Sequence, residues 1–207
     1  KSNYSFTSPK SNILKIVSDE EFLKRIKKKH RYYIKQSEKA GLTWKNYSGS
    51  ETAKVFSIVY GEMKESKNLN LPIIDIDAFS KILSLNKDGK SRLFTFTGLE
   101  NNKPVSVCVV SILDNKAFYH YAASTDRGRV TSASYGMIFN LIKELRNLSV
   151  DELDFGGISA DGSSAGVDFF KLGFNGEELL KIGEFDISKS KVYSYVFSKL
   201  LQFKKNL

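Results

Sequence analysis

The stretch FFKLGFNGE, residues 169–177, places one lysine among phenylalanines and just before a glycine. Lys171 is the only charged residue between Phe169 and Phe174. A lysine in the last turn of a helix hydrogen-bonds the final carbonyl groups and interacts favourably with the helix dipole. A fixed ammonium in apolar surroundings can instead stabilise a negative charge that develops on a substrate. Lys171 is therefore the first candidate for chemistry, with a helix-end lysine as the alternative.

Two carboxylates lie near this lysine in the sequence or beside a glycine turn. Asp168 precedes Lys171 by three residues, so on a helix the two side chains would share a face and could pair. Asp154 comes just before the pair Gly156-Gly157. Either carboxylate could act as a general base or serve only the structure.

The few histidines and the single cysteine do not form a recognisable metal-binding motif. The chain has two histidines, His30 and His120, one cysteine, Cys108, and neither a CxxC nor an HExxH motif. We therefore expect no metal site, and we expect Cys108 to be a buried, reduced apolar side chain. His120 alternates with two tyrosines in a predicted strand, so it either faces a cleft or has a structural role.

The elements that must position these residues can be predicted from periodicity and turn chemistry. Ser18 to Glu21 forms a capping box, and the helix that it begins is expected to continue to Gly41. Three strands joined by short polar turns predict an antiparallel meander. The middle strand is apolar on both faces, so it should be central. The meander strands are 92–99, 104–113 and 116–123, and the other expected elements are strands 42–47, 152–155 and 178–187 and helices 51–64, 77–85 and 165–172.

Two further helices complete the expected order. Thr131 or Ser132 should cap a helix that follows the meander. Residues 191–203 read as a terminal amphipathic helix, with four apolar side chains facing inward: Val192, Val196, Phe197 and Leu200. The order of elements predicts an α/β fold, a mixed sheet with helices on both faces.

Four stretches carry a resemblance to a known family, in the same order as in that family. They are HRYYIKQSEKAGL (30–42), FYHYAASTDRGRVTSASYGMIF (118–139), LDFGGIS (153–159) and FFKLGFNGE (169–177). Together they resemble the Fem-type (FemABX) peptidoglycan aminoacyltransferases within the GNAT-fold acyltransferases. The resemblance implies a GNAT-like fold with a mostly antiparallel sheet, and it implies that this chain is similar to the second of the family's two GNAT-like halves.

The resemblance also implies a domain organisation. Residues 1–41 would be an N-terminal segment and a basic helix, which is either a linker or the remnant of a first half. Residues 42–187 would form the GNAT-like acyltransferase domain, and 188–207 a C-terminal amphipathic basic helix. Acceptor-binding residues that the family places in its first half cannot be located in this sequence.

For the site, the resemblance makes Lys171 the charge that stabilises the oxyanion of acyl transfer, with Phe170 as its packing partner and Asp154 as a further catalytic candidate. It places the donor's phosphates near Arg127, Arg129, Thr131 and Ser132, where backbone N–H groups meet the start of a helix. The glycine spacing of strict coenzyme A-binding loops is missing there, and a solvated turn is the alternative.

Charge distribution suggests a polyanionic partner. The net charge is +9, and the excess of lysine and arginine lies in residues 1–40 and 189–207. The basic helix carries Lys27, Lys28, Arg31 and Lys35, which could contact tRNA phosphates or anionic lipid headgroups. The alternative is a charged helix that only faces solvent.

The resulting hypothesis is an acyltransferase of EC class 2.3. It would move an aminoacyl group from aminoacyl-tRNA onto an amine of a peptidoglycan precursor or related lipid-linked glycan, without a bound cofactor. One alternative is an acyl-coenzyme A-dependent N-acyltransferase on an amino sugar, and another is a non-catalytic domain that binds RNA or membrane. With no apolar run long enough to span a bilayer, we expect a cytoplasmic protein, peripheral at most to the inner membrane. The oligomeric state stays open.

Overall fold

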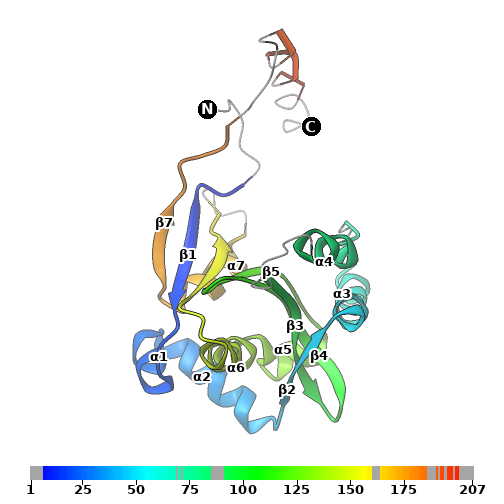
Figure 1. Ribbon diagram of the computed structural model, residues 1–207. Coiled ribbons are helices and arrows are strands. Elements are labelled where there is room, and N and C mark those ends of the chain that lie inside the picture. The colour runs from blue at the N-terminus through cyan, green and yellow to red at the C-terminus, as the bar shows by residue number, and fades with distance from the viewer. Residues whose placement is uncertain are drawn as a thin grey trace.

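The computed structural model describes residues 7–68, 70, 72–84 (backbone only for 82–84), 91–159, 164–185, 190, 192–193, 195–197 and 199–200. Within this part of the chain, seven strands form one sheet in the order β2-β3-β4-β5-β6-β1-β7 (Figure 1). Neighbouring strands are antiparallel except for β5 and β6, which are parallel. The strands are β1 (Lys10–Lys15), β2 (Thr43–Ser48), β3 (Ser91–Glu100), β4 (Lys103–Leu113), β5 (Lys116–Ser124), β6 (Glu152–Gly157) and β7 (Glu177–Leu180).

Helices cover both faces of the sheet, which confirms the predicted α/β fold with a mixed, mostly antiparallel sheet. On one face, α1, α2 and α6 contribute Phe22, Ile34 and Met137 to the larger core cluster. On the other, α3 and α4 contribute Phe56 and Ile76 to a second cluster. Figure 1 shows α2 beside α6, and α3 beside α4. The helices are α1 (Asp19–Arg25), α2 (Lys28–Lys39), α3 (Ser50–Ser66), α4 (Ile76–Ser84), α5 (Asp126–Val130), α6 (Ala133–Asn147) and α7 (Ala165–Leu172).

The predicted meander is confirmed as β3, β4 and β5, with β4 covered on both sides. Val107 and Val109 belong to the cluster under α3 and α4, whereas Cys108 and Val110 belong to the cluster under α6. All four side chains are fully buried. An apolar run without alternation therefore marks a strand that is buried on both faces.

The sequence pattern did not predict β1. Its residues Ser11 and Asn12 are polar, yet both are buried, so the alternation that marks a strand is missing. The strand lies between β6 and β7 and is antiparallel to both. Residues of the N-terminal segment thus belong to the same sheet as β6 and β7. The domain boundaries at 41 and 187 stay predictions.

The continuous helix expected from Ser18 to Gly41 is two helices. Ser18 is the N-cap of α1 as predicted, and its Oγ accepts from the N–H of Glu21 at 3.3 Å. The Glu21 carboxylate pairs with Arg25. Ile26 and Lys27 are extended, with ψ of 154° and 147°, because Ile26 is buried in the core and the Lys27 N–H donates to the Gly173 carbonyl at 2.9 Å. Tertiary contacts break the helix where helix propensity alone would continue it.

The C-terminal part also differs from expectation. Strand β7 ends at Leu180, and Ile187, the predicted end, lies outside the described residues. The four side chains predicted to face inward from the terminal helix are at least half exposed: Val192, Val196, Phe197 and Leu200. That prediction is wrong, because these side chains do not reach the core, and Figure 1 shows the segment apart from the sheet. Among the helices of the described residues, none has the length and hydropathy needed to cross a membrane.

Candidate functional site

A cavity lies where two parallel strands separate. Strands β5 and β6 share only three paired positions, Lys116–Phe118 with Glu152–Asp154. Past these positions lies a cavity of about 490 Å³, bounded by β5 and β6, by residues of α5, α6 and α7, and by the end of α3. Lys171 lines it, and we call it the Lys171 cavity. Its other lining residues used below are Lys67, Tyr119, His120, Ser124, Arg129, Tyr135, Gly156, Gly157 and Phe170.

The Lys171 ammonium bonds a different element from its own helix. Its Nζ donates to the Gly157 carbonyl at 2.8 Å, at the end of β6. Gly156 has a φ of 82°, and a Cβ at that residue would lie 3.2 Å from the Lys171 Nζ. Burial lowers the pKa of Lys171, whereas the Asp168 and Asp154 carboxylates raise it. This geometry places a partly buried ammonium against the Asp-Phe-Gly-Gly turn instead of against the last carbonyls of α7.

Phe170 and the two carboxylates surround this lysine in different ways. The Phe170 ring packs against Tyr135, with ring centroids 5.0 Å apart, and against Phe155 and Phe174. Asp154 Oδ1 accepts from the Gly156 N–H at 2.8 Å, which holds the turn. Asp168 accepts from the N–H and hydroxyl of Ser159. The suggested Asp168–Lys171 ion pair is not formed in the described residues, although the Asp168 charge still acts on the lysine.

The N-terminal segment holds the end of α7, which sequence reasoning missed. The carbonyls in the last turn of a helix have no partner within the helix. Here Asn12 Nδ2 donates to the Lys171 carbonyl at 2.9 Å, and His30 Nε2 lies 2.9 Å from the Phe170 carbonyl. The Lys27 N–H donates to the Gly173 carbonyl, as described above. The strand β1 and the start of α2 therefore fix the backbone on both sides of Lys171.

His30 is fully buried among aromatic rings. Tyr135 and Phe174 contact it edge-on, each with ring centroids 4.9 Å away. Burial lowers the pKa of His30, and Lys27 and Lys29 lower it further, against the hydrogen bond to Phe170. Because its partner is a carbonyl, Nε2 carries the proton, and Nδ1 is buried without a hydrogen-bond partner. The sequence motif showed His30 only as the start of a basic segment.

The expected phosphate-binding loop is the short helix α5. Thr125 is its N-cap, accepting from the Gly128 N–H at 3.0 Å, and Thr131 is its C-cap. The Thr131 hydroxyl donates to the Arg127 carbonyl at 3.0 Å. Ser132, one of the two residues predicted to cap the next helix, is the N-cap of α6. Its hydroxyl does not cap the helix but donates to Gln36 Oε1, and its φ is 56°.

The two arginines of this segment point to different partners. Arg127 makes a bidentate ion pair with Glu100 of β3, at 2.6 and 2.7 Å. Arg129 lines the Lys171 cavity, pairs with Asp126 and donates to the Ser124 carbonyl at 3.1 Å. Of the four predicted donor-binding residues, Arg129 is the one that the structure brings to Lys171 and Phe170. Their phosphate-binding role stays a prediction.

The four predicted polyanion-binding residues of the basic helix also differ in their surroundings. Lys27, Lys28 and Lys35 are exposed. Arg31 is half-buried, and its guanidinium donates to the Leu23 carbonyl at 3.1 Å and the Ile26 carbonyl at 2.5 Å. These carbonyls end α1, so Arg31 serves the junction between α1 and α2, whereas the three lysines remain available to a polyanion.

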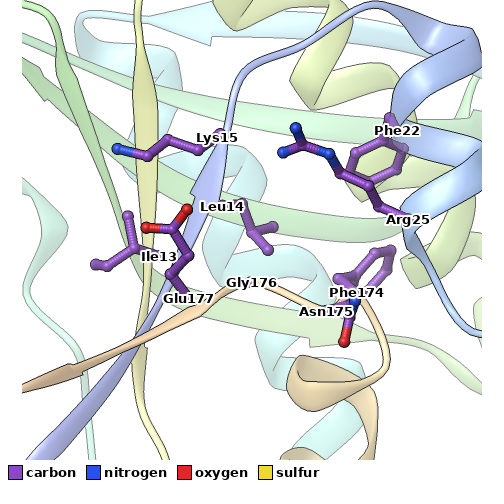
Figure 2. A pocket seen from close by; sticks show the side chains of 9 residues that line it. All are labelled: Ile13, Leu14, Lys15, Phe22, Arg25, Phe174, Asn175, Gly176 and Glu177. Atoms are coloured by element: carbon purple, nitrogen blue, oxygen red, sulfur yellow. The ribbon is translucent and has the colours of Figure 1, made fainter.

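A second cavity, of about 240 Å³, lies on the other side of the turn that follows α7 (Figure 2). Leu14, Phe22 and Phe174 form its apolar wall, and Arg25 and Glu177 lie around it. The segment 169–177 therefore separates two cavities, and the larger one contains the lysine. Among the described residues, no group of three or more His, Cys, Asp or Glu side chains could hold a metal ion.

Comparisons with known proteins place this geometry in a family. No curated protein sequence matches the chain. A crystal structure of FemX superposes with a TM-score of 0.76 at 18% identity, over 95% of this chain and 66% of that one. L-PGS from Bacillus licheniformis gives 0.56 at 13% identity, over 95% and 66%. The C-terminal domain of a lysylphosphatidylglycerol synthetase from Agrobacterium fabrum gives 0.60 at 13% identity, over 86% and 59%.

These structural likenesses show the fold, and this chain spans less than two thirds of the length of each of the three. The sequence comparison adds the family. Residues 89–202, more than half of the chain, match the FemAB family, and they include β3 to β7, the Asp-Phe-Gly-Gly turn and Lys171. The chain belongs to the FemAB family.

Proposed function

We propose that this protein transfers an aminoacyl group from aminoacyl-tRNA to an amine of a peptidoglycan precursor or related cell-envelope glycan. The observation that carries the proposal is the Lys171 ammonium, held at 2.8 Å from the Gly157 carbonyl on the wall of a cavity between two separating strands. Family membership and the FemX-like fold support the same reaction class.

The chemistry of acyl transfer suits this arrangement. Attack of an amine on an ester or thioester carbonyl gives a tetrahedral oxyanion, which a preorganised positive charge stabilises. The rings of Phe170 and Tyr135 bound the cavity beside Lys171, so part of the water is excluded there. Electrostatic interactions strengthen where water is excluded. Phe170 is thus proposed to keep the lysine charge effective, and Asp154 to hold the turn that receives it.

The identity of the acyl donor distinguishes the proposed function from the alternative of an acyl-coenzyme A-dependent N-acyltransferase. The Arg129 side chain reaches the cavity, whereas Arg127 is engaged by Glu100 and the hydroxyls of Thr131 and Ser132 are engaged within the fold. A single arginine with a five-residue helix is a small site for the pyrophosphate of coenzyme A. This favours aminoacyl-tRNA over acyl-coenzyme A.

A transfer assay tests the proposal. The purified protein would be given aminoacyl-tRNA or acyl-coenzyme A, with lipid-linked peptidoglycan precursor, amino-sugar nucleotides or phosphatidylglycerol vesicles as acceptors. Mass spectrometry would detect the added mass. We expect transfer from aminoacyl-tRNA to the glycan precursor. Transfer from acyl-coenzyme A to an amino sugar would support the first alternative, and phosphatidylglycerol as the acceptor would contradict the glycan part of the proposal. No transfer from either donor, together with salt-sensitive RNA binding, would indicate a binding domain.

Charge reversal on α2 tests whether the basic helix meets tRNA. The Lys28→Glu, Lys35→Glu double variant should weaken tRNA binding about tenfold or more at low salt, because each lost phosphate contact also removes part of the counterion-release contribution. The slope of log K against log salt should become shallower by the amount expected for about two lost phosphate contacts. Filter binding over a salt series would measure both quantities.

Lys54→Glu provides the matched control. Lys54 is an exposed lysine on α3, the helix that covers the opposite face of the sheet. Its reversal should change tRNA affinity by less than about twofold, since long-range charge effects are screened within roughly 10 Å. An equal loss per reversed charge in both proteins would mean that only net charge matters, and no loss in either would leave α2 as a solvated helix.

A further inference from the structure

His120 lies on a β-bulge in the strand that borders the Lys171 cavity. The register between β4 and β5 passes from Val109–Tyr121 to Val110–Tyr119, so His120 has no opposite residue. A bulge bends the strand and re-aims a side chain, and bulges are frequent next to active sites. Here the Tyr119 ring packs on Phe155 in one core cluster, while His120 and Tyr121 both lie toward α3 and α4.

The ring of His120 is held on one side only. Its Nε2 lies 2.7 Å from Ser111 Oγ, and the Phe79 ring of α4 contacts it edge-on with centroids 4.6 Å apart. Within the described residues, Nδ1 makes no hydrogen bond. When Nε2–H donates to Ser111, Nδ1 carries the lone pair of a neutral imidazole. His120 as a whole is solvent-exposed, but partial burial of its ring lowers the pKa of His120 below the ordinary histidine value, and the Asp154 charge opposes that shift, so the neutral form predominates at pH 7.

Lys171 and His120 line the same cavity. A Cβ built on Gly156 would lie 3.2 Å from Lys171 Nζ and 3.6 Å from the Tyr119 carbonyl, which directly precedes His120. Both side chains line the cavity, and the Asp154 charge acts on both of them. A substrate that fills the cavity therefore meets both side chains.

The other titratable groups near the cavity are less suited to accepting a proton. The Asp154 carboxylate is held by the Gly156 N–H, and Asp168 is held by Ser159. Burial raises the pKa of Tyr119 and Tyr135, so both stay protonated. Lysine and arginine side chains, such as Lys67 and Arg129, carry a proton at neutral pH.

We propose that His120 is the catalytic proton acceptor of the reaction, with Ser111 as its positioning residue. The inference rests on the proposed function. The amine lone pair forms the new C–N bond at the acyl carbon, and the resulting oxyanion faces Lys171. The amine proton moves to Nδ1 of His120. As the bond from the acyl carbon to the leaving oxygen or sulfur breaks, that atom takes the proton from His120, which returns the imidazole to its neutral form.

Two substitutions of His120 test this role in the transfer assay. His120→Ala should lower kcat about 100-fold or more, the usual contribution of a general base, with the acceptor KM changed less than about threefold. Added imidazole should restore part of the rate of His120→Ala. His120→Gln can keep the hydrogen bond to Ser111 and should be as slow as His120→Ala. Tyr121→Phe, the next residue of β5, is the control and should stay within about threefold of the wild type.

The pH profile separates a base from a structural side chain. The wild-type kcat/KM should fall on acidification below pH 6.5, the ordinary histidine value, because the pKa of His120 is lowered and the protonated ring cannot accept a proton. In His120→Gln the fall should lose the part due to His120 and keep the part due to protonation of the acceptor amine, so kcat/KM should fall less steeply below pH 6.5. The Asp154 charge acts on the ring, and Lys171, Arg129 and Lys67 line the same cavity; all four are unchanged in that variant.

Each outcome decides one hypothesis. An active wild type with an equally fast His120→Gln would overturn the inference and leave the proposed function in place. A slow variant without imidazole rescue and with an equally steep fall below pH 6.5 would also overturn it, in favour of a structural histidine. A wild type without transfer from any donor would overturn the proposed function itself.

Discussion

Replacing Lys171 with methionine should lower kcat for transfer about 1,000-fold while the protein stays folded. Loss of one preorganised oxyanion donor costs on the order of 10²–10³ in kcat, and here the substitution removes a full charge. The side chain is partly buried, and burial lowers the pKa of Lys171, which means that its surroundings disfavour the charge. An apolar side chain of similar length should therefore be tolerated. Single-turnover kinetics would measure the chemical step, and thermal unfolding would report stability.

Two further variants complete this test. Lys171→Ala should be as inactive as Lys171→Met, because both lack the ammonium. Lys143, on the surface of α6, has its ammonium 3.3 Å from the Asp19 carboxylate of α1. Lys143→Met removes this ammonium, and Arg146 still pairs with Asp19. It should retain full activity. A Lys171→Ala protein that transfers at the wild-type rate would remove the oxyanion role and return Lys171 to a structural one.

Replacing Gly173 with alanine should destabilise the protein by about 3 kcal/mol, the upper part of the range for overpacking a core. A Cβ at this residue would overlap the imidazole of His30, which aromatic rings surround. Either the ring or the end of α7 must move, and both carry the hydrogen bond between His30 and Phe170. Urea unfolding at fixed pH would give the free energy of unfolding.

A double-variant cycle shows whether the His30 ring is the cause. In the His30→Ala background, Gly173→Ala should cost less by at least about 1 kcal/mol, since contacting residues couple by 0.5–3 kcal/mol. Gly166→Ala is the control in the first turn of the same helix, because a Cβ there meets nothing within 4 Å. It should be neutral or stabilising by up to about 1 kcal/mol, as expected from helix propensity. Additive costs in the cycle would contradict the steric explanation.

The sequence predicted elements whose signal is local. The Val105 to Val110 run gave the central strand, and the last short helix was placed at its observed bounds, Ala165–Leu172. In both cases the apolar pattern and the flanking turn residues agree with the tertiary environment. Its apolar surroundings in the sequence made Lys171 a candidate and the family resemblance suggested its role, but its position in the cavity could not be derived from periodicity.

What the sequence did not reveal depends on contacts between distant segments. Asn12 looks like a polar residue in a tail, but its amide satisfies a carbonyl of α7. The break at Ile26 and Lys27 arises because the backbone there bonds to Gly173. Arg31 looks like a member of a basic face until its guanidinium is found on two carbonyls of α1. The local pattern of residues in one sequence contains no information about partners in distant segments.

The place of β1 in the sheet has a consequence for how the protein is made. Ile13 pairs with Asp154 on one side and with Glu177 on the other, so the first partner exists only after the chain has been synthesised to position 154 and the second only after position 177. Pairing over such sequence separations is slow. During synthesis, the β1 segment must wait unpaired, while β2 to β5 can already form their meander. The hydrogen bond from Asn12 to the Lys171 carbonyl would then be among the last to form, so the proposed catalytic lysine is fixed only when folding is complete.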